Sequence, residues 1–276
     1  MVTIRVLLEN TTSSPGLKSR HGLSIAIERE GGDLLLDVGP DGLFAENARK
    51  MGFDLAGVAA LALSHSHFDH TGGLDEFCRL NPRAAVYLLD TTDSEYYAKL
   101  FGLLRLPVGL RCSEAARRRI TSLRAGREIA KGAWFIPNSV GSHPKPRQNR
   151  VLFKKVGGRL LADDFAHEGL LVVEEGGELV VFNSCSHNGV VNSLESVAKA
   201  FPGKRVRSYV GGFHFHNPLG LQNESAGDLD AFADYVRKSG VRLYTGHCTG
   251  ARSVACLKQA LGDQLHTLST GLVLEV

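Results

Sequence analysis

Apolar residues recur along the first half of the chain in two patterns. Short apolar runs bounded by polar residues or glycine predict β-strands, and they cover residues 2–8, 23–27, 34–39, 58–63 and 84–89. Apolar residues at helical spacing predict helices at 44–51 and 74–80. The first half is therefore expected to alternate strands and helices.

The second half repeats this pattern. Strands are predicted at 151–156, 170–173, 179–182, 206–210, 241–244 and 272–276, and helices at 191–201, 228–238 and from Gly250 to 261. Two halves of mixed strands and helices suggest two sheets packed face to face with helices outside. No change of composition separates the halves, so residues 1–276 are expected to form a single α/β (α+β) domain.

Residues 91–142 differ from both halves, because they are polar and basic and their spacing favours helices. The clearest helix is predicted at 115–120, and a short strand at 134–136. We interpret this segment as a helical cap inserted near the candidate site. A peripheral pair of helices that never touches substrate is the alternative.

Four side chains that could bind metal follow the apolar run at 58–63. They are His65, His67, Asp69 and His70. Side chains two apart in an extended chain point to the same side, so His65 and His67 can share one ion. Asp69 and His70 lie around the turn and can reach a second ion. Imidazole and carboxylate together suit zinc, iron or manganese.

This stretch resembles the HxHxDH signature of the metallo-β-lactamase superfamily. The resemblance implies the four-layer αββα sandwich of that superfamily and a metal site, but it says almost nothing about substrate. The run at 34–39 also looks like the LLxDxG strand that precedes the signature in this superfamily. By the resemblance, Asp37 would be a buried carboxylate that orients the site.

One loop cannot surround two ions, so further ligands must come from other strand ends. His187 and His247 follow apolar strands and lie in turns rich in Gly, Ser and Cys. A histidine that only hydrogen-bonds within its loop is the alternative at each position. Our assignment is His65, His67 and His187 for the first ion, and Asp69, His70 and His247 for the second.

The superfamily usually has an aspartate that bridges the two ions, on a turn like the one that carries His187. Here the three residues before His187 are Ser184, Cys185 and Ser186, none of them a carboxylate. An oxygen of hydroxide or substrate could be the only bridge, Cys185 could supply a thiolate, or Asp163 or Asp164 could arrive from elsewhere. A thiolate changes the preferred metal, so the metal and the number of ions stay open.

A further constellation runs from Gly211 to His216. Glycines at a strand end allow close approach of the backbone, so His214 could contact substrate, act as an acid or bind metal. A histidine flanked by aromatic residues is also often structural. His214 is therefore a candidate catalytic residue, and His216 is left undecided.

Composition narrows the location and the partners. The formal charge of +3 does not by itself imply a nucleic-acid partner, although basic residues at 105–127 and 145–150 could face an anionic small molecule. The five cysteines show no paired spacing that suggests a disulfide framework or a zinc knuckle. With no signal-peptide pattern and no apolar run near the roughly 20 residues of a membrane span, a cytoplasmic protein is expected. A homo-oligomer is left open.

Several segments together resemble one subgroup of the superfamily. They are Glu9-Asn10, 21–24, 64–73, 185–187, 211–214 and 247–250. Its members are commonly labelled 7,8-dihydropterin-6-methyl-4-(β-D-ribofuranosyl)-aminobenzene-5'-phosphate synthase or metal-dependent hydrolases. The label implies a reaction that joins a dihydropterin methyl diphosphate to an aminobenzene ribosyl phosphate and releases diphosphate.

The expected function is a dinuclear metal-dependent hydrolase that acts on a small phosphorylated or ester-containing metabolite. Two zinc ions are the expected cofactor, with iron or manganese as alternatives, and a metal-bound hydroxide would be the nucleophile. Asp69 would accept a proton from the nucleophile, and His214 would donate one to the leaving group. The synthase reaction, redox chemistry at iron and a non-catalytic ligand sensor are the alternative functions.

Overall fold

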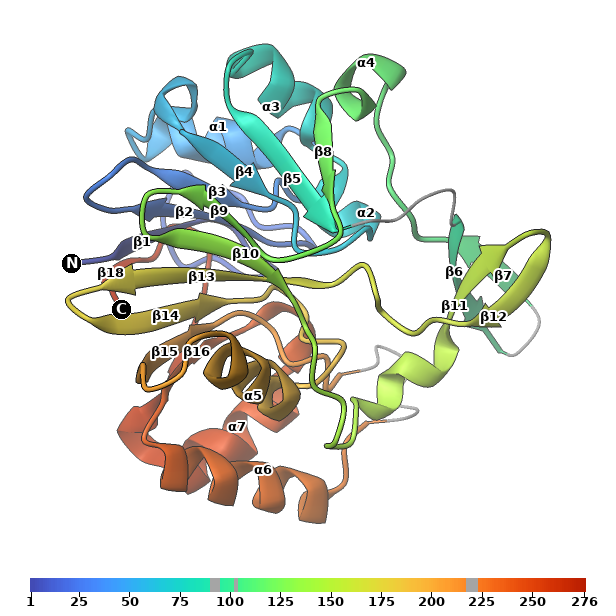
Figure 1. The fold of residues 1–276 in the computed structure, drawn as a ribbon, viewed down its shortest axis with the longest axis vertical. Coiled ribbons are helices and arrows are strands. Elements are labelled where there is room, and N and C mark those ends of the chain that lie inside the picture. Colours follow the sequence, from blue (N-terminus) through green and yellow to red (C-terminus); the bar gives the residue numbers. More distant parts are fainter. Residues whose placement is uncertain (90–94, 102–103, 217–222) are drawn as a thin grey trace.

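Two mixed sheets of seven strands each lie face to face between two layers of helices (Figure 1). The computed structural model describes residues 1–89, 95–101, 104–216 and 223–276. This is the expected four-layer αββα arrangement, an α/β metallo-β-lactamase fold. No helix in these described ranges is both long enough and apolar enough to cross a membrane.

The first sheet combines antiparallel and parallel strands. In order across the sheet they are β18 (Val273–Glu275), β1 (Thr3–Leu8), β2 (Ser24–Glu28), β3 (Leu34–Leu36), β4 (Ala60–Ala62), β5 (Ala85–Leu89) and β8 (Ile120–Leu123). Strands β18 to β3 are antiparallel neighbours, and β3 to β8 are parallel neighbours. The carboxyl ends of β3 and β4 therefore lie at the same edge.

The second sheet is built in the same way. In order its strands are β17 (Leu265–Thr267), β16 (Arg242–Thr245), β15 (Val206–Val210), β14 (Glu178–Phe182), β13 (Gly169–Glu175), β10 (Ala133–Pro137) and β9 (Arg127–Ala130). Strands β14 to β17 are parallel neighbours, and β14, β13, β10 and β9 are antiparallel neighbours. The carboxyl ends of β14, β15 and β16 thus share one edge.

The apolar core has three parts, one between the sheets and one under each helical layer. Between the sheets, Ile25 and Leu36 belong to the same buried cluster as Phe135 and Val180. Three helices, α1 (Leu43–Lys50), α3 (Leu74–Leu80) and α4 (Glu114–Arg117), cover the first sheet. Three more, α5 (Val190–Ala200), α6 (Ala226–Ser239) and α7 (Ala251–Leu261), cover the second.

The remaining helical turns are short. They are α2 (Phe68–Thr71), η1 (Leu55–Gly57), η2 (Arg147–Val151), η3 (His247–Thr249) and η4 (Gly262–Gln264). Two of them, α2 and η3, contain predicted metal ligands.

The prediction that residues 91–142 are helical is wrong. The described part of this segment contains strands and a single helix, α4, of four residues. The helix predicted at 115–120 ends early because Ile120 pairs with Val86 and extends the first sheet as β8. Local spacing could not show this pairing, because the partner strand lies far back in the chain. Residues 91–94 and 102–103 fall outside the described ranges.

Two hairpins form a third sheet beside the main body (Figure 1). Its strands are β12 (Arg159–Ala162), β11 (Leu152–Val156), β6 (Glu95–Leu100) and β7 (Leu104–Pro107). The Phe68 amide, in the candidate metal loop, donates to the carbonyl of Val108, just after β7, over 2.9 Å. The Tyr96 ring lies 6.3 Å from that of His67. That residues 91–142 form a cap over the candidate site therefore stays a prediction, with strands in place of helices. That the chain is a single domain also stays a prediction.

Gly211, which follows β15, offers a test of how tightly the strand ends pack. Its φ is 143°, and a Cβ there would lie 1.8 Å from the carbonyl oxygen of Asn183, after β14. We expect Gly211→Ala to lower the free energy of unfolding by at least about 3 kcal/mol, because the two loops must separate. Chemical denaturation measures the change.

Gly227→Ala is the matched control. Gly227 lies in α6, and a Cβ there would meet nothing within 4 Å. Its substitution should change the stability by no more than about 1 kcal/mol, in the stabilising direction. Equal losses in the two variants would contradict the packing argument.

Candidate metal centre

Five loops meet at the edge where parallel strands of both sheets end. The loops after β3 and β4 belong to the first sheet, and those after β14, β15 and β16 belong to the second. Carboxyl ends of parallel strands are the usual place for ligand sites in such sheets. The structure brings all six predicted metal ligands together at this edge.

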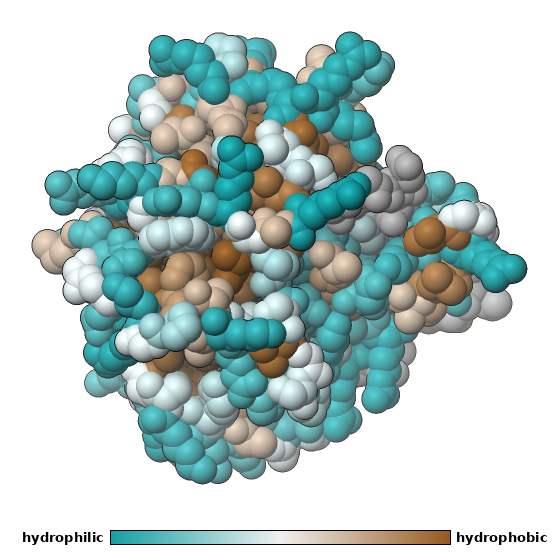
Figure 2. All heavy atoms as spheres, in the orientation of Figure 1, coloured by the Kyte–Doolittle hydropathy of each residue, from teal (hydrophilic) through white to brown (hydrophobic). Residues whose placement is uncertain are grey.

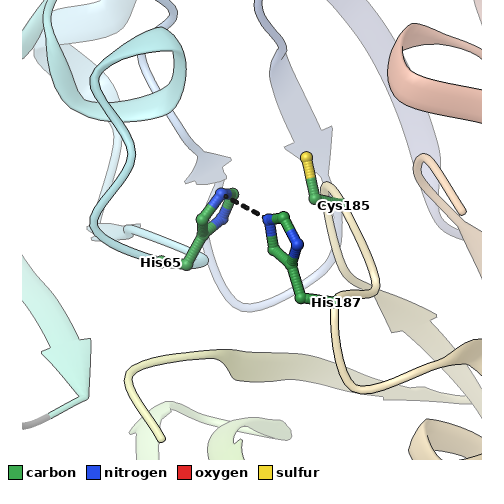
Figure 3. A group of neighbouring side chains, drawn as sticks. All are labelled: His65, Cys185 and His187. Carbon is green, nitrogen blue, oxygen red and sulfur yellow. Dashed lines mark hydrogen bonds between the residues drawn. The ribbon is translucent and has the colours of Figure 1, made fainter. Parts of the chain in front are cut away.

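The first three predicted ligands form one group. The Nε2 atom of His65 lies 3.0 Å from Nδ1 of His67 and 3.3 Å from Nε2 of His187. All three side chains are buried. Figure 3 shows that His65 and His187 reach each other from two different loops, with Cys185 beside them.

Asp69, His70 and His247 form the second group. The Oδ2 atom of Asp69 lies 3.4 Å from Nε2 of His70 and 3.5 Å from Nε2 of His247. The same oxygen lies 3.3 Å from Nε2 of His21, a histidine at the exposed rim. Burial alone would raise the pKa of Asp69, but the neighbouring imidazoles of His70, His21 and His247 hold that pKa well below its usual value.

The spacing of these atoms fits tetrahedral metal ions. Bonds of about 2.0–2.1 Å to nitrogen or oxygen place neighbouring ligand atoms of a tetrahedron about 3.3 Å apart. The four distances given above between predicted ligands, from 3.0 to 3.5 Å, lie around that value. Within the described part of the chain, Nε2 of His247 is buried and has no hydrogen-bond partner.

The protonation of the histidines also suits metal ligands. Burial lowers the pKa of His67 to about 3 and that of His247 to about 4, so both rings are neutral. A neutral ring offers the lone pair that a metal needs. Burial also lowers the pKa of His70, but Asp69 and Asp37 outweigh it and raise that pKa to about 10. A cation is thus favoured at His70, whether proton or metal.

Cys185 lies between the two groups. Its Sγ is 3.2 Å from Nε2 of His70, and it clusters with His65 and His187 on one side and with His70 and His247 on the other. Burial raises the pKa of this thiol well above its usual value. A bound cation would reverse that preference, because a coordinating thiol is deprotonated.

The aspartates considered as replacements for the bridge have other partners. Asp163 accepts a hydrogen bond from the amide of Phe165 and contacts His167 over 3.2 Å. Asp164 is paired with Lys154 at 2.6 Å and is largely exposed. These contacts favour Cys185 over either aspartate at the bridging position.

The carboxylate of Asp37 orients two of the predicted ligands. It accepts hydrogen bonds from the amide and hydroxyl of Ser64, both at 2.7 Å, from Nδ1 of His70 at 2.8 Å, and from the hydroxyl of Ser184. The Ser64 hydroxyl in turn contacts Nδ1 of His65 at 2.8 Å. Asp37 thus directs Nε2 of His70, and through Ser64 that of His65, towards the centre.

His214 faces the same cavity. Its backbone is in the left-handed region, with φ 56°, and neither ring nitrogen has a hydrogen-bond partner among the described residues. Its ring lies 4.2 Å from that of His187, and burial lowers its pKa to about 3. The ring is therefore neutral at pH 7. His216 is exposed and lines the mouth of the cavity.

The cavity itself is small, about 220 Å³. Its lining includes His67, Asp69, Cys185, His187, His214 and His247, together with Asn10, His21, Gln148, His216 and Cys248. Because ligand pockets for drug-sized molecules usually span about 300–1,000 Å³, this space suits the reacting group of a substrate and not a whole large molecule.

Sequence reasoning missed His21 and His167. The His167 ring accepts a hydrogen bond from the amide of Ser66 at 3.1 Å and so supports the backbone between two predicted ligands. The available signal was that His167 lies at the end of a predicted strand, as the assigned histidines do, although it precedes its strand and they follow theirs. Nothing in the local pattern around His21 indicated that it would reach Asp69.

Two mixed sheets between helices, with buried His, Asp and Cys side chains at their shared edge, define a metallo-β-lactamase fold with a metal site. A sequence profile of the metallo-β-lactamase superfamily matches residues 18–91. Over these residues, and in its fold, the chain is similar to the metallo-β-lactamase superfamily.

Several proteins are similar over nearly the whole chain. The 7,8-dihydropterin-6-methyl-4-(β-D-ribofuranosyl)-aminobenzene-5'-phosphate synthase of Methanocaldococcus jannaschii is 26% identical over 93% of this chain and 90% of its own. The structure of Tm1679, described as a metal-dependent hydrolase of the β-lactamase superfamily, matches with a TM-score of 0.83 and 28% identity, over 100% of this chain and 99% of that one.

A more distant structure shares the fold. Zn(2+)-bound PqqB from Methylobacterium extorquens matches with a TM-score of 0.57 and 13% identity, over 99% of this chain and 100% of that one. At this identity the likeness concerns the fold alone.

The role of Asp37 can be tested by Asp37→Asn. All the groups that face this carboxylate are donors, so the amide NH₂ of Asn would oppose one of them. We expect metal affinity to fall by about 10–100-fold, measured by competition with a chelator. Asp263→Asn, in the surface turn η4, is the control, and a similar loss there would contradict the assignment.

Proposed function

We propose that this protein is a dinuclear metal-dependent hydrolase acting on a small, anionic, phosphorylated or ester-containing metabolite. The observation that carries the proposal is that in each of two groups of three ligand atoms, one atom lies 3.0–3.5 Å from the other two, close to the spacing around a tetrahedral ion. The similarity to the metallo-β-lactamase superfamily supports it. The fold alone would not, because one fold hosts many chemistries.

In this proposal His65, His67 and His187 would hold one ion and Asp69, His70 and His247 would hold the other, with Cys185 as a further ligand near both groups. Two divalent ions there would supply a water nucleophile at neutral pH and neutralise negative charge on the substrate. Thiolate and imidazole together favour zinc, and the thiolate argues against manganese. Iron stays the alternative metal.

The chain's own residues would then position and protonate the reactants. His214 is neutral and both its ring nitrogens are free of partners among the described residues, so its ring N–H can donate a hydrogen bond to an oxygen of the substrate or of the leaving group. Asp69 is a weak base, because His70 and its other imidazole neighbours stabilise its charged form. We therefore propose metal binding as its main role and proton acceptance as secondary.

The preference for an anionic substrate rests mainly on the charge of the ions. The basic loop at 145–150 adds little, because Arg147 is paired with Asp228 at 2.7 Å and with Glu224 at 3.6 Å. The Lys145 ammonium donates to the carbonyl of Asp164. Gln148 is the member of this loop that reaches the cavity.

A second candidate function is the synthase reaction named for the relative from M. jannaschii, supported by 26% identity over 93% of this chain. In that reaction an arylamine nitrogen would form the new bond to carbon and diphosphate would leave. The two activities are separable, because diphosphate release that requires the arylamine indicates the synthase, and release without it indicates hydrolysis.

The metal content is the first quantity to measure. Protein purified without added metal should carry about two zinc ions per chain by elemental analysis. Cys185→Ala should retain fewer ions, and Cys185→Asp should recover them, because it restores the bridging carboxylate that is usual in the superfamily. Cys256→Ala, at an exposed cysteine, is the control. Full metal occupancy in Cys185→Ala would rule out a bridging thiolate. A metal content of mostly iron in the unsubstituted protein would favour redox chemistry over hydrolysis.

His67 and His214 should behave differently when replaced. His67→Ala should lose metal and activity together, because a ligand is removed. His214→Ala should keep both ions and lose about 10²–10⁴-fold in kcat. The turnover of both variants is measured on a panel of phosphate esters and carboxylic esters. Normal turnover by His214→Ala would exclude it from catalysis, and full metal occupancy without turnover in the unsubstituted protein would favour a sensor.

A further inference from the structure

His187 and His247 lie in different loops, yet the same set of contacts holds each of them. A buried glutamate accepts the backbone N–H of the histidine, and an asparagine contacts both its carbonyl oxygen and its Nδ1 atom. In the proposed centre His187 would bind one ion and His247 the other.

At His247 the contacts come from the end of the first strand. The Glu9 carboxylate accepts the His247 amide at 2.5 Å. The Asn10 side-chain NH₂ donates to the His247 carbonyl at 3.1 Å, and Asn10 Oδ1 lies 3.0 Å from Nδ1 of the ring. The amide of Gly22 also donates to Asn10 Oδ1 at 3.2 Å.

At His187 the contacts come from two other segments. The Glu168 carboxylate, just before β13, accepts the His187 amide at 2.5 Å. The Asn149 side-chain NH₂, from η2, donates to the His187 carbonyl at 2.7 Å. Asn149 Oδ1 lies 3.1 Å from Nδ1 of the ring. The two sets of contacts are alike although the elements that supply them differ.

These contacts determine which ring nitrogen carries the proton. A carbonyl oxygen only accepts, so the NH₂ of each asparagine must face it and the amide oxygen must face the ring. Because the amide oxygen also only accepts, Nδ1 of each histidine must carry its proton. The lone pair of each ring is then on Nε2, the atom that lies in the ligand groups.

The glutamates hold a backbone that would otherwise be unfavourable. Ser186, just before His187, has φ 51°, and His247 has φ 48°. Left-handed backbone is costly for such residues. Both carboxylates are almost fully buried, and each has further donors, Thr11 for Glu9 and Asn188 for Glu168. These hydrogen bonds reduce the cost of burying the two carboxylates.

We propose that Glu9 with Asn10, and Glu168 with Asn149, are matching positioning residues that present Nε2 of His247 and of His187 to the metal centre. Each pair serves one ion. The inference rests on the proposed metal-dependent function, but it concerns metal binding and histidine tautomers, not turnover.

The test uses Asn10→Ala and Asn149→Ala in the full chain, with Zn²⁺ alone as the probe and a competing chromophoric chelator. Each variant should lose about 10-fold or more in affinity for one ion and keep the affinity for the other. Asn10→Asp and Asn149→Asp keep the acceptor for Nδ1, so they should bind Zn²⁺ more tightly than the alanine variants. A purely structural role would not be rescued in this way.

Asn81→Ala is the matched control. Asn81 is buried and also bridges backbone groups, donating to the carbonyls of Leu55 and Val58 and accepting the amides of Arg83 and Ala84. It should lower the stability of the protein without changing Zn²⁺ affinity. A loss of affinity equal to that of the Asn10 or Asn149 variants would overturn the proposal.

Nitrogen-15 NMR of the imidazoles in metal-free protein gives an independent readout. His187 and His247 should both be protonated at Nδ1 in the unsubstituted protein, and each should lose that preference when its own asparagine is replaced by alanine. Protonation at Nε2 in the unsubstituted protein would overturn the proposal. Zn²⁺ binding without any hydrolysis would refute the proposed function and leave this inference standing.

Discussion

The buried carboxylate of Asp37 ties the two sheets together where the histidines meet. It binds Ser64 and His70 on the loop after β4, in the first sheet, and Ser184 on the loop after β14, in the second. A buried carboxylate is costly unless donors surround it, so the two loops are held where Asp37 is satisfied. The short distance between His65 and His187 depends on that arrangement.

The same physical solution recurs around the centre. Glu9 and Glu168 are buried and saturated with donors, and each accepts the amide of a predicted ligand. Such contacts restrict both the backbone and the ring of the ligand, so they hold the imidazole nitrogens towards one another. A centre held in this way loses little conformational entropy when it binds metal.

One fold is shared by proteins with different functions, so the chemistry depends on the residues of the site. The distinctive feature here is Cys185, a thiol that faces both groups of ligand atoms. In the proposed centre a soft sulfur takes the place of the usual hard carboxylate, which changes the metals that are favoured. Replacing this sulfur by an oxygen ligand should therefore have a measurable effect on the metal content of the centre.

The sequence by itself determined most strands and helices, the fold class and the ligand-rich loop from His65 to His70, because these depend on local spacing. Tertiary structure alone decided that Ile120 extends a sheet beside Val86, and that Cys185 and not Asp163 lies between the ligand groups. It also decided that Glu9 holds His247, 238 positions along the chain. Such contacts follow from how distant strands pair, and no local pattern of polar and apolar residues records that pairing.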